Sequence, residues 1–331
     1  MTPMRERKIS VVAPAFNEAE NLPVLIDRLR SVLAPYDDYE IVIVDDGSRD
    51  RSLEVLRALA DEDGRVRFLS LSRNFGHQNA LKAGLDHATG DCVIMLDADL
   101  QHPPELIPAM VERWREGFEV VNMIRRDDDT PAFKKWTAAL FYRFVNAISD
   151  FKIRPGAADF RLLDRKVIDA LNRLGERTLF FRGIIPWLGF RQCEIEYAPA
   201  ARAHGSSKYD LSRMALLALD GIISSSTRPL RLSTILGLAM STLAMLYAAY
   251  AVTVKLALGT AVSGWTSLLM GVMLLGGVQL VMLGIVGEYI GRILLETKGR
   301  PAYIVRERSE PAAESPVARL QARLEGLRAL P

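Results

Sequence analysis

The sequence lacks the glycine-rich motifs by which many nucleotide-binding domains are recognised. No GxGxxG pattern follows the first predicted strand, and no GxxxxGK[ST] pattern occurs anywhere in the chain. The first motif lets a backbone approach a dinucleotide, and the second surrounds the phosphates in P-loop proteins. These two classes of nucleotide-binding protein are therefore excluded.

Cysteine and histidine are scarce. Cys92 and Cys193 lie far apart without a CxxC pattern, and both fall in apolar or strand-like runs, which favours buried, reduced thiols over a disulfide or a metal site. The histidines show no spacing typical of metal ligands. We expect each one to be a surface residue or a local hydrogen-bonding group: His77, His87, His102 and His204.

Charge of one sign is not in excess either. The 331 residues contain 42 Lys and Arg against 40 Asp and Glu, so the overall charge does not indicate a nucleic-acid partner. No apolar stretch with a cleavage site follows residues 1–10, and we therefore expect no signal peptide.

Two long runs carry no charge at all, residues 232–254 and 256–287. Each exceeds the roughly 20 residues that span a bilayer core. A buried hairpin of a soluble protein is the alternative, which two such runs in succession make the weaker interpretation. We predict a transmembrane helical hairpin over residues 231–290. Its small residues favour close helix packing, within one chain or between the subunits of a homo-oligomer: Gly271, Gly276, Gly277 and Gly284.

The basic residues around this hairpin predict its orientation. Arg228 and Arg231 precede the first span, whereas the connector offers only Lys255. Five more basic residues follow the second span: Arg292, Lys298, Arg300, Arg306 and Arg308. Basic residues favour the cytoplasmic side, so we expect an inner-membrane protein with both termini and the domain that precedes the hairpin in the cytoplasm. The segment 291–331 is expected to end in a mobile tail.

Residues 8–125 alternate strand and helix patterns. Short apolar runs predict strands at 8–13, 40–44, 66–71, 93–96 and 120–124, with amphipathic helices between them. Such an alternation is typical of an α/β fold with a mainly parallel sheet covered on both faces. We place this Rossmann-like core at residues 1–130.

Two carboxylates, Asp97 and Asp99, directly follow the predicted strand 93–96. Ligand crevices form at the carboxyl ends of strands in such sheets. A pair of carboxylates there suits Mg²⁺ or Mn²⁺, which complete their coordination with water and substrate phosphate. Taken alone, Asp-x-Asp also fits a solvated loop.

Two other strands end in similar residues. The first ends in the sequence PAFNE at 14–18, and the second ends in DDGS at 45–48. Each motif alone could be a simple turn or helix cap, because Asp, Gly and Ser suit turns. Since three strand ends carry acids or amides toward one edge, we expect a nucleotide and metal crevice there.

Several motifs together resemble the GT-A fold glycosyltransferases of family 2: PAFNE, VDDGSRD, SRNFGHQNALKAGL, LDADLQHPPE, ADFRLLDR and HGSSKY. Within this family the chain is similar to the polyprenyl-phosphate branch, which includes dolichol-phosphate mannose synthase and bacterial undecaprenyl-phosphate sugar transferases. The resemblance covers roughly residues 8–300. It implies transfer of a sugar from a nucleoside diphosphate, UDP rather than GDP, to a polyprenyl phosphate, with inversion at the anomeric carbon. The QxxRW motif of the polymerising members is absent, which favours a single transfer.

The resemblance also implies roles for individual residues. The cation is held by Asp97 and Asp99, with Gln101 beside it. Asp99 and Asp159 are the catalytic candidates; Asp159 acts as a base or orients the substrate, unless it only forms a structural salt bridge to Arg161 or Arg165. The nucleotide-binding set comprises Pro14, Asn17, Glu18, Asp45, Asp46 and the stretch from Arg73 to Lys82.

Two anions must meet in such a site, and basic residues are required around them. We assign Arg125 and Lys134 to the acceptor phosphate and Arg202 with Lys208 to the donor, whose diphosphate the segment 204–209 is expected to cover. A solvated surface role is the alternative for each. Residues 131–149 and 210–226 place apolar residues at helical spacing, and we predict two interfacial helices in this acceptor-side region, 131–230.

Three other functions stay open from the sequence. The acceptor could be another lipid headgroup, and the donor could be GDP-mannose. Alternatively, the chain could be a scaffold that binds nucleotide sugars without turnover, although intact Asp46, Asp97, Asp99 and Asp159 argue against a degenerate enzyme.

Overall fold

The computed structural model describes residues 7–126, 156–176, 180–198, 226–258 and 264–309. They belong to two compact units. A sheet unit takes in residues 1–142, 153–208 and 301–331, and a helical unit takes in residues 143–152 and 209–300. The first predicted interfacial helix, 131–149, lies outside the described residues, and so does all of the second, 210–226, except its last residue, Ser226.

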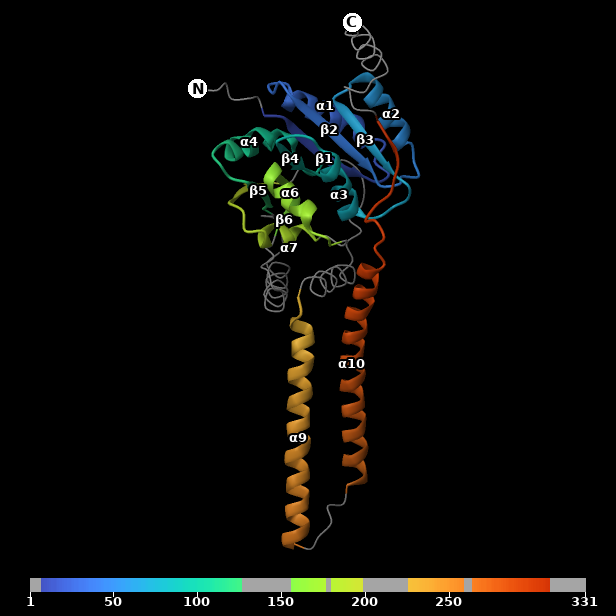
Figure 1. Ribbon diagram of the computed structural model, residues 1–331, viewed down its shortest axis with the longest axis vertical. Coiled ribbons are helices and arrows are strands. Elements are labelled where there is room, and N and C mark those ends of the chain that lie inside the picture. The colour runs from blue at the N-terminus through green and yellow to red at the C-terminus, as the bar shows by residue number, and fades with distance from the viewer. Residues whose placement is uncertain (1–6, 127–155, 177–179, 199–225, 259–263, 310–331) are drawn as a thin grey trace, which may run out of the picture. The chain divides into compact units, whose positions relative to one another are not determined.

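The sheet unit is built on one eight-stranded sheet of order β7-β5-β6-β4-β1-β2-β3-β8 (Figure 1). Its strands are β1 (Ile9–Ala15), β2 (Tyr39–Asp45), β3 (Val66–Leu71), β4 (Cys92–Met95), β5 (Val120–Arg125), β6 (Ala157–Asp164), β7 (Gln192–Tyr197) and β8 (Val305–Arg308). The helices are α1 (Asn21–Leu33), α2 (Ser52–Glu62), α3 (His77–His87), η1 (Pro104–Leu106), α4 (Ile107–Arg115), α6 (Arg165–Arg173) and α7 (Phe181–Trp187).

The centre of the sheet is parallel. β1 pairs with both β2 and β4, and β2 pairs with β3, all in the parallel sense. β6 joins β4 and β5 antiparallel, and β8 joins β3 antiparallel. The prediction of a mainly parallel α/β sheet is therefore confirmed, and all five predicted strands are present within a few residues of the expected bounds.

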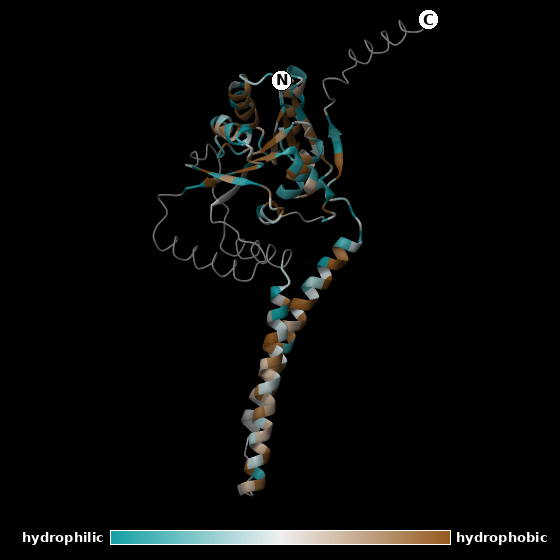
Figure 2. Ribbon diagram, turned by 60° about the vertical axis from the view of Figure 1, so that its left-hand side comes forward, coloured by the Kyte–Doolittle hydropathy of each residue, from teal (hydrophilic) through white to brown (hydrophobic). Residues whose placement is uncertain are grey.

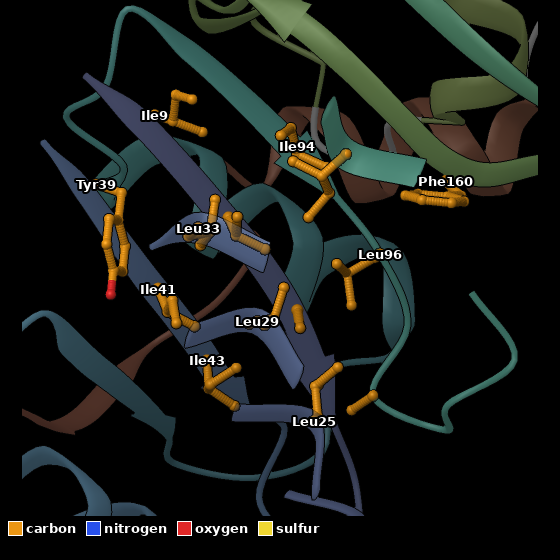
Figure 3. Close-up of a cluster of buried hydrophobic side chains, with 14 of the residues drawn as sticks. Ile9, Leu25, Leu29, Leu33, Tyr39, Ile41, Ile43, Ile94, Leu96 and Phe160 are labelled. Carbon is orange, nitrogen blue, oxygen red and sulfur yellow. The ribbon is translucent and has the colours of Figure 1, made fainter. Parts of the chain in front are cut away.

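Apolar side chains cover both faces of the central strands. Along β1, Ile9 and Val11 belong to one buried cluster while Val12 belongs to another, and β2 and β4 alternate in the same way. Figure 3 shows the first cluster, in which Leu25 and Leu29 of α1 lie over these strands. The second cluster contains α3, α6 and α7. Burial on two faces explains why the strands are continuous apolar runs.

The helical unit contains two long apolar helices, α9 (Arg228–Leu258) and α10 (Trp265–Thr297), which contact each other. Both contain a segment long and apolar enough to cross a membrane, Ser233–Ala257 and Met270–Thr297. Figure 2 shows apolar residues along the length of these helices, and most of their large apolar side chains are exposed. Such helices need lipid rather than water around them.

The predicted small-residue packing is not found between these two helices. Within the described residues, and apart from the adjacent residues and the nearby backbone of the same helix, no atom lies within 4 Å of a Cβ built at Gly271, Gly276, Gly277 or Gly284. A side chain at Gly237 of α9, in contrast, would lie 3.7 Å from Met282. Packing of the four glycines against another subunit stays a prediction.

The chain rejoins the sheet after α10. Leu69 of β3 pairs with Arg308 of β8, and Glu307 accepts two hydrogen bonds from Arg57 at 2.8 and 2.6 Å. These residues belong to the segment 291–331, for which the sequence predicts no strand. VRER has no apolar alternation, and its pairing partner is far away in the sequence. The tail beyond Ser309 lies outside the described residues.

Glu40 is a buried acid at the amino ends of the central strands, where it forms hydrogen bonds that link four segments of the chain. Only 3% of this residue is exposed. Its carboxylate accepts hydrogen bonds from Ser10 Oγ at 2.6 Å, from Thr89 N at 2.6 Å and from Arg67 Nη1 at 2.7 Å. Burial alone would raise the pKa of Glu40, but these hydrogen bonds and Lys8 outweigh it and lower the pKa from 4.5 to about 2.

We predict that Glu40→Gln lowers the free energy of unfolding by about 3 kcal/mol near neutral pH, because Arg67 loses its buried carboxylate. Since the folded-state pKa is depressed, the stabilisation is complete above pH 4.5 and is lost as the pH falls toward 2. Thermal unfolding of the purified protein should therefore show a difference from wild type that shrinks in acid. The exposed Glu54→Gln is the control, and equal stability of wild type and Glu40→Gln would contradict the prediction.

Candidate functional site

The carboxyl ends of β4, β1 and β2 are adjacent in the sheet, so the loops that follow them meet at one edge. Asp46 N donates to Ala15 O at 2.9 Å, and Leu96 N donates to Val12 O at 3.0 Å. All three predicted acid-bearing loops therefore lie along this edge, as expected for parallel neighbours.

The loop after β1 is bonded directly to the loop after β2. Asn17 N donates to Ser48 Oγ at 2.9 Å, and Arg49 N donates to Asn17 Oδ1 at 2.8 Å. Glu18 N donates to Ser52 Oγ at 3.0 Å. Asn17 has a φ of 57°, a left-handed conformation that asparagine tolerates better than most residues. The Asn17 side chain is exposed at this edge, and it also holds the two loops together.

Asp45 and Asp46, predicted as nucleotide-binding residues, are 1% and 3% exposed. Asp45 accepts from Ser48 N and Ser70 Oγ, at 3.0 and 2.9 Å. Asp46 accepts from Phe75 N and Gly76 N, at 2.7 and 2.9 Å, and its burial raises its pKa despite these two bonds. Both carboxylates organise the loops in this structure, and their direct contact with a nucleotide stays a prediction.

Gly47 lies between the loops that follow β2 and β3. Its φ is +70°, and a Cβ at this position would stand 2.4 Å from Arg73 C and 2.7 Å from Asn74 N. Glycine is therefore required for two reasons: the left-handed conformation, and the close approach of the backbone of the loop after β3. The guanidinium of Arg73 lies exposed over the ring of Phe75, 4.4 Å from its centroid.

Asp97 and Asp99 begin the loop after β4, and both are partly exposed. Asp97 Oδ1 is a buried oxygen without a hydrogen-bond partner, although His77 Nε2 lies 3.4 Å away. A buried oxygen without a partner is costly unless a ligand completes it. In the described part of the chain, no three His, Cys, Asp or Glu side chains could hold a metal ion by themselves. These residues fit a cation that takes one or two carboxylates and completes its coordination with water and phosphate.

Asp159 lies at the centre of a charged cluster and is 3% exposed. Arg182 donates to both of its oxygens, at 3.1 and 3.0 Å, and Gln78 Nε2 donates to Oδ2 at 3.2 Å. His77 Nε2 and Arg161 Nη2 lie 3.5 and 3.6 Å from the carboxylate. Burial alone would raise the pKa of Asp159, but His77, Arg182 and Arg161 outweigh it and hold the pKa far below its usual value.

The cations of this cluster respond to the same carboxylate. Burial alone would lower the pKa of His77, but Asp159 and Asp97 outweigh it and raise the pKa. Burial lowers the pKa of Arg161 to about 10. The salt bridge that the sequence analysis considered for Asp159 thus exists with Arg161. Arg165 instead donates to Gly90 O at 2.8 Å and does not reach the site.

The register of β6 explains why Asp159 is here. β6 runs antiparallel to β4, and Met95 pairs with Arg161. Continuing this register past the end of β4 brings Asp97 opposite Asp159. His77 then approaches from the first turn of α3 and lies within 3.5 Å of both carboxylates.

Two histidines lie at this edge. The expectation of a surface residue or a local hydrogen-bonding group fits both, but it did not place either of them beside the acids. His77 bridges Asp97 and Asp159, as described above. His102 is 6% exposed and its Nδ1 accepts a hydrogen bond from Asp97 N at 3.0 Å. Burial lowers the pKa of His102 more than the nearby Asp97 raises it. His102 stands three residues after Asp99, a signal that sequence reasoning could have used. Arg182 and Gln78 carry no comparable signal.

The other predicted site residues differ in where the structure places them. Pro14 is buried in β1, and Gln101 N donates to Asp99 Oδ1 at 3.1 Å, so both lie at the edge. Lys82 does not, because its ammonium is bonded to Asp86 and to Asn172 Oδ1. Arg125 ends β5 and is exposed. The remaining basic candidates lie outside the described residues: Lys134, Arg202 and Lys208.

Comparisons with known proteins agree with this architecture. The family model for glycosyl transferase family 2 matches residues 10–171, and the model for the GtrB C-terminal hairpin matches residues 228–293. The first match covers Asp97, Asp99 and Asp159. The second covers α9 and most of α10.

Individual relatives extend over nearly the whole chain. An uncharacterized glycosyltransferase of Bacillus subtilis, YkcC, is 44% identical over 92% of this chain and 94% of its own length. A bactoprenol glucosyl transferase of Shigella phage SfX is 44% identical over 91% of this chain and 99% of its own. Among solved structures, the mannosyltransferase PcManGT of Pyrobaculum calidifontis aligns with a TM-score of 0.47 and 20% identity, over 67% of this chain and 64% of that one.

We predict that Gly47→Ala separates the loops after β2 and β3 and weakens UDP binding at least tenfold, because the added Cβ collides with backbone. The control is Gly117→Ala. Gly117 also has a positive φ, but a Cβ there would come no closer than 3.7 Å to the flexible end of Arg191, so it should cost only about 1 kcal/mol. Calorimetric UDP titrations and thermal unfolding of both variants measure the difference. Equal effects would contradict the proposed loop contact.

Proposed function

Because this chain belongs to glycosyl transferase family 2, we propose that it transfers one glucose from UDP-glucose to the phosphate of a polyprenyl lipid. The observation that carries the proposal is the combination in one chain of the family 2 sheet with the GtrB hairpin. Relatives named bactoprenol glucosyl transferases share 44–45% of its residues along almost their full length. The resemblance predicted from the motifs is thereby confirmed, and glucose is proposed from the names of these relatives.

A divalent cation, Mg²⁺ or Mn²⁺, is part of the proposal. The unpartnered Oδ1 of Asp97 and the nearby Asp99 supply oxygen ligands, and the donor diphosphate would complete the coordination. When bound, the cation neutralises charge that develops on the departing nucleoside diphosphate. We propose that Gln101, whose backbone N–H donates to Asp99, lies beside the cation.

The acceptor needs no base. A lipid monophosphate is already an anion near neutral pH, so its oxygen can attack the anomeric carbon without losing a proton, and direct displacement inverts that carbon. Asp159 is buried, fully bonded and held ionised, which suits a residue that orients His77 and Arg182 better than a proton acceptor. We therefore assign Asp159 the orienting role.

The chief electrostatic requirement is to bring two anions together. Arg182 is a cation at this edge that the motifs did not indicate, and its side chain is 41% exposed although it is bonded to Asp159. We propose that Arg182 faces one of the substrate phosphates, while Asp159 fixes the direction of its guanidinium. Arg125 and Lys134 for the acceptor, and Arg202 and Lys208 for the donor, are retained from the sequence as further proposals.

The helical hairpin anchors the enzyme in the membrane that contains its acceptor. α9 and α10 are long and apolar enough to cross a bilayer. The basic residues on either side of the hairpin favour both termini and the sheet unit on the cytoplasmic side of the inner membrane, where nucleotide sugars are made. Self-association through the glycines of α10 is a further proposal.

The alternatives from the sequence differ in substrate. A GDP-mannose donor or another lipid acceptor would use the same edge of the sheet, and a panel of nucleotide sugars and lipids distinguishes them. A scaffold without turnover is the non-enzymatic alternative, and it would bind the nucleotide sugar without consuming it.

We predict that the protein in membranes converts radiolabelled UDP-glucose and undecaprenyl phosphate into a lipid-linked sugar, and that chelation of divalent ions abolishes this conversion. Asp99→Ala should lower kcat at least a hundredfold, because it removes a proposed cation ligand. Asp169→Ala, which removes an exposed carboxylate on α6, is the matched control and should keep wild-type activity. Full turnover by Asp99→Ala would disprove the metal assignment. If the protein consumed a different nucleotide sugar and not UDP-glucose, the proposed donor would be wrong.

A further inference from the structure

We propose that His102 is a positioning residue for the cation and donor site: its imidazole holds the backbone of Asp97 and thereby sets the direction of the Asp97 carboxylate. This inference rests on the proposed function and deepens it. It assigns a task to a residue that is buried beneath the site and takes no direct part in the transfer.

The contact is a hydrogen bond from Asp97 N to His102 Nδ1, 3.0 Å long. A ring nitrogen that accepts a hydrogen bond carries no proton, so His102 is the neutral tautomer protonated at Nε2. The same Nδ1 stands 3.6 Å from Asp97 Oδ2. Because Nδ1 is occupied by the backbone, the imidazole cannot be a metal ligand or a proton acceptor through this atom.

Aromatic rings hold the imidazole in place. The ring of Phe160 stacks on it with centroids 5.1 Å apart and an interplanar angle of 16°. Tyr197 of β7 meets both rings edge-on, at 6.3 Å from His102 and 5.8 Å from Phe160. Phe160 is the neighbour of Asp159 in β6, so one strand supplies an acid to the site and the support for the loop beside it.

The loop after β4 requires such support. Its last backbone bond to β1 is made by Leu96 N, and the next N–H, that of Asp97, donates to His102. Leu100 has a φ of 63°, an unfavourable left-handed conformation for a leucine. Gln101 N then donates to Asp99 Oδ1 at 3.1 Å. His102 thus closes a strained loop whose two carboxylates are the proposed cation ligands.

Two substitutions of His102 distinguish the effect of its hydrogen-bond acceptor, Nδ1, from the effect of its aromatic ring. His102→Asn keeps an oxygen close to the position of Nδ1 but loses the aromatic stack. His102→Phe keeps the stack but has no acceptor for Asp97 N. His87→Phe is the matched control, because His87 lies at the end of α3 and its Nδ1 is 2.8 Å from Ala83 O, a local contact of the helix.

The readout is the dissociation constant of Mn²⁺ in the presence of UDP, measured by electron paramagnetic resonance on the full-length protein, with unfolding midpoints recorded in parallel. We expect His102→Phe to weaken Mn²⁺ binding about 10- to 100-fold, the usual effect of losing a partner behind a metal ligand. His102→Asn should stay within about fivefold of wild type even where it unfolds earlier, and His87→Phe should bind normally. If His102→Phe does not fold, His102→Leu, which also lacks the acceptor, replaces it.

Normal Mn²⁺ binding by His102→Phe would overturn the inference and leave the proposed function intact. Equal weakening by His102→Asn and His102→Phe would also overturn it, since the ring rather than the acceptor would then matter. A wild-type protein that binds neither Mn²⁺ nor UDP would refute the proposed metal-dependent function and this inference together.

Discussion

The balance of charge at the carboxyl ends of β4 and β6 is the constraint on which the site depends. Three carboxylates, Asp97, Asp99 and Asp159, lie at this edge, where their mutual repulsion must be offset. The negative charge of Asp159 is offset by two of the protein's own side chains, Arg182 and Arg161. It leaves Asp97 with an unpartnered oxygen. We therefore propose different tasks for these similar side chains: Asp159 would orient the protein's own cations, and Asp97 would bind a cation from solution.

Around this centre, several residues that were predicted to bind the nucleotide stabilise the loops in this structure. Asp45 and Asp46 are buried and bonded to loop backbone, and Asn17 joins the loops after β1 and β2. Gly47 lets the next loop approach without collision. A donor that binds at this edge therefore meets a surface whose shape is already fixed, which lowers the entropic cost of binding. The chain segment after the membrane hairpin contributes too, since β8 completes the sheet beside β3.

Much of this architecture could be predicted from the sequence, because local patterns determine it. Apolar runs predicted the central strands, uncharged runs predicted the hairpin, and the acid pair after the fourth strand indicated the candidate site. The contacts of His77 and Arg182 with Asp159 could not be predicted, since they depend on β6 lying antiparallel beside β4, a pairing between distant segments. β8 could not be predicted for the same reason, because it pairs with β3, which is far away in the sequence. The interfacial helices and the basic residues Lys134, Arg202 and Lys208 stay predictions.

The central claim is that a divalent cation joins the Asp97–Asp99 loop to the donor diphosphate. Electron–nuclear double resonance on the protein with bound Mn²⁺ and UDP tests it most directly, because the ³¹P coupling reports whether phosphate oxygens coordinate the ion. The account predicts a strong ³¹P coupling that disappears when Asp97 and Asp99 are both replaced by Asn. A protein-bound Mn²⁺ whose ³¹P coupling survives that double substitution, or one that never shows a coupling, would contradict it.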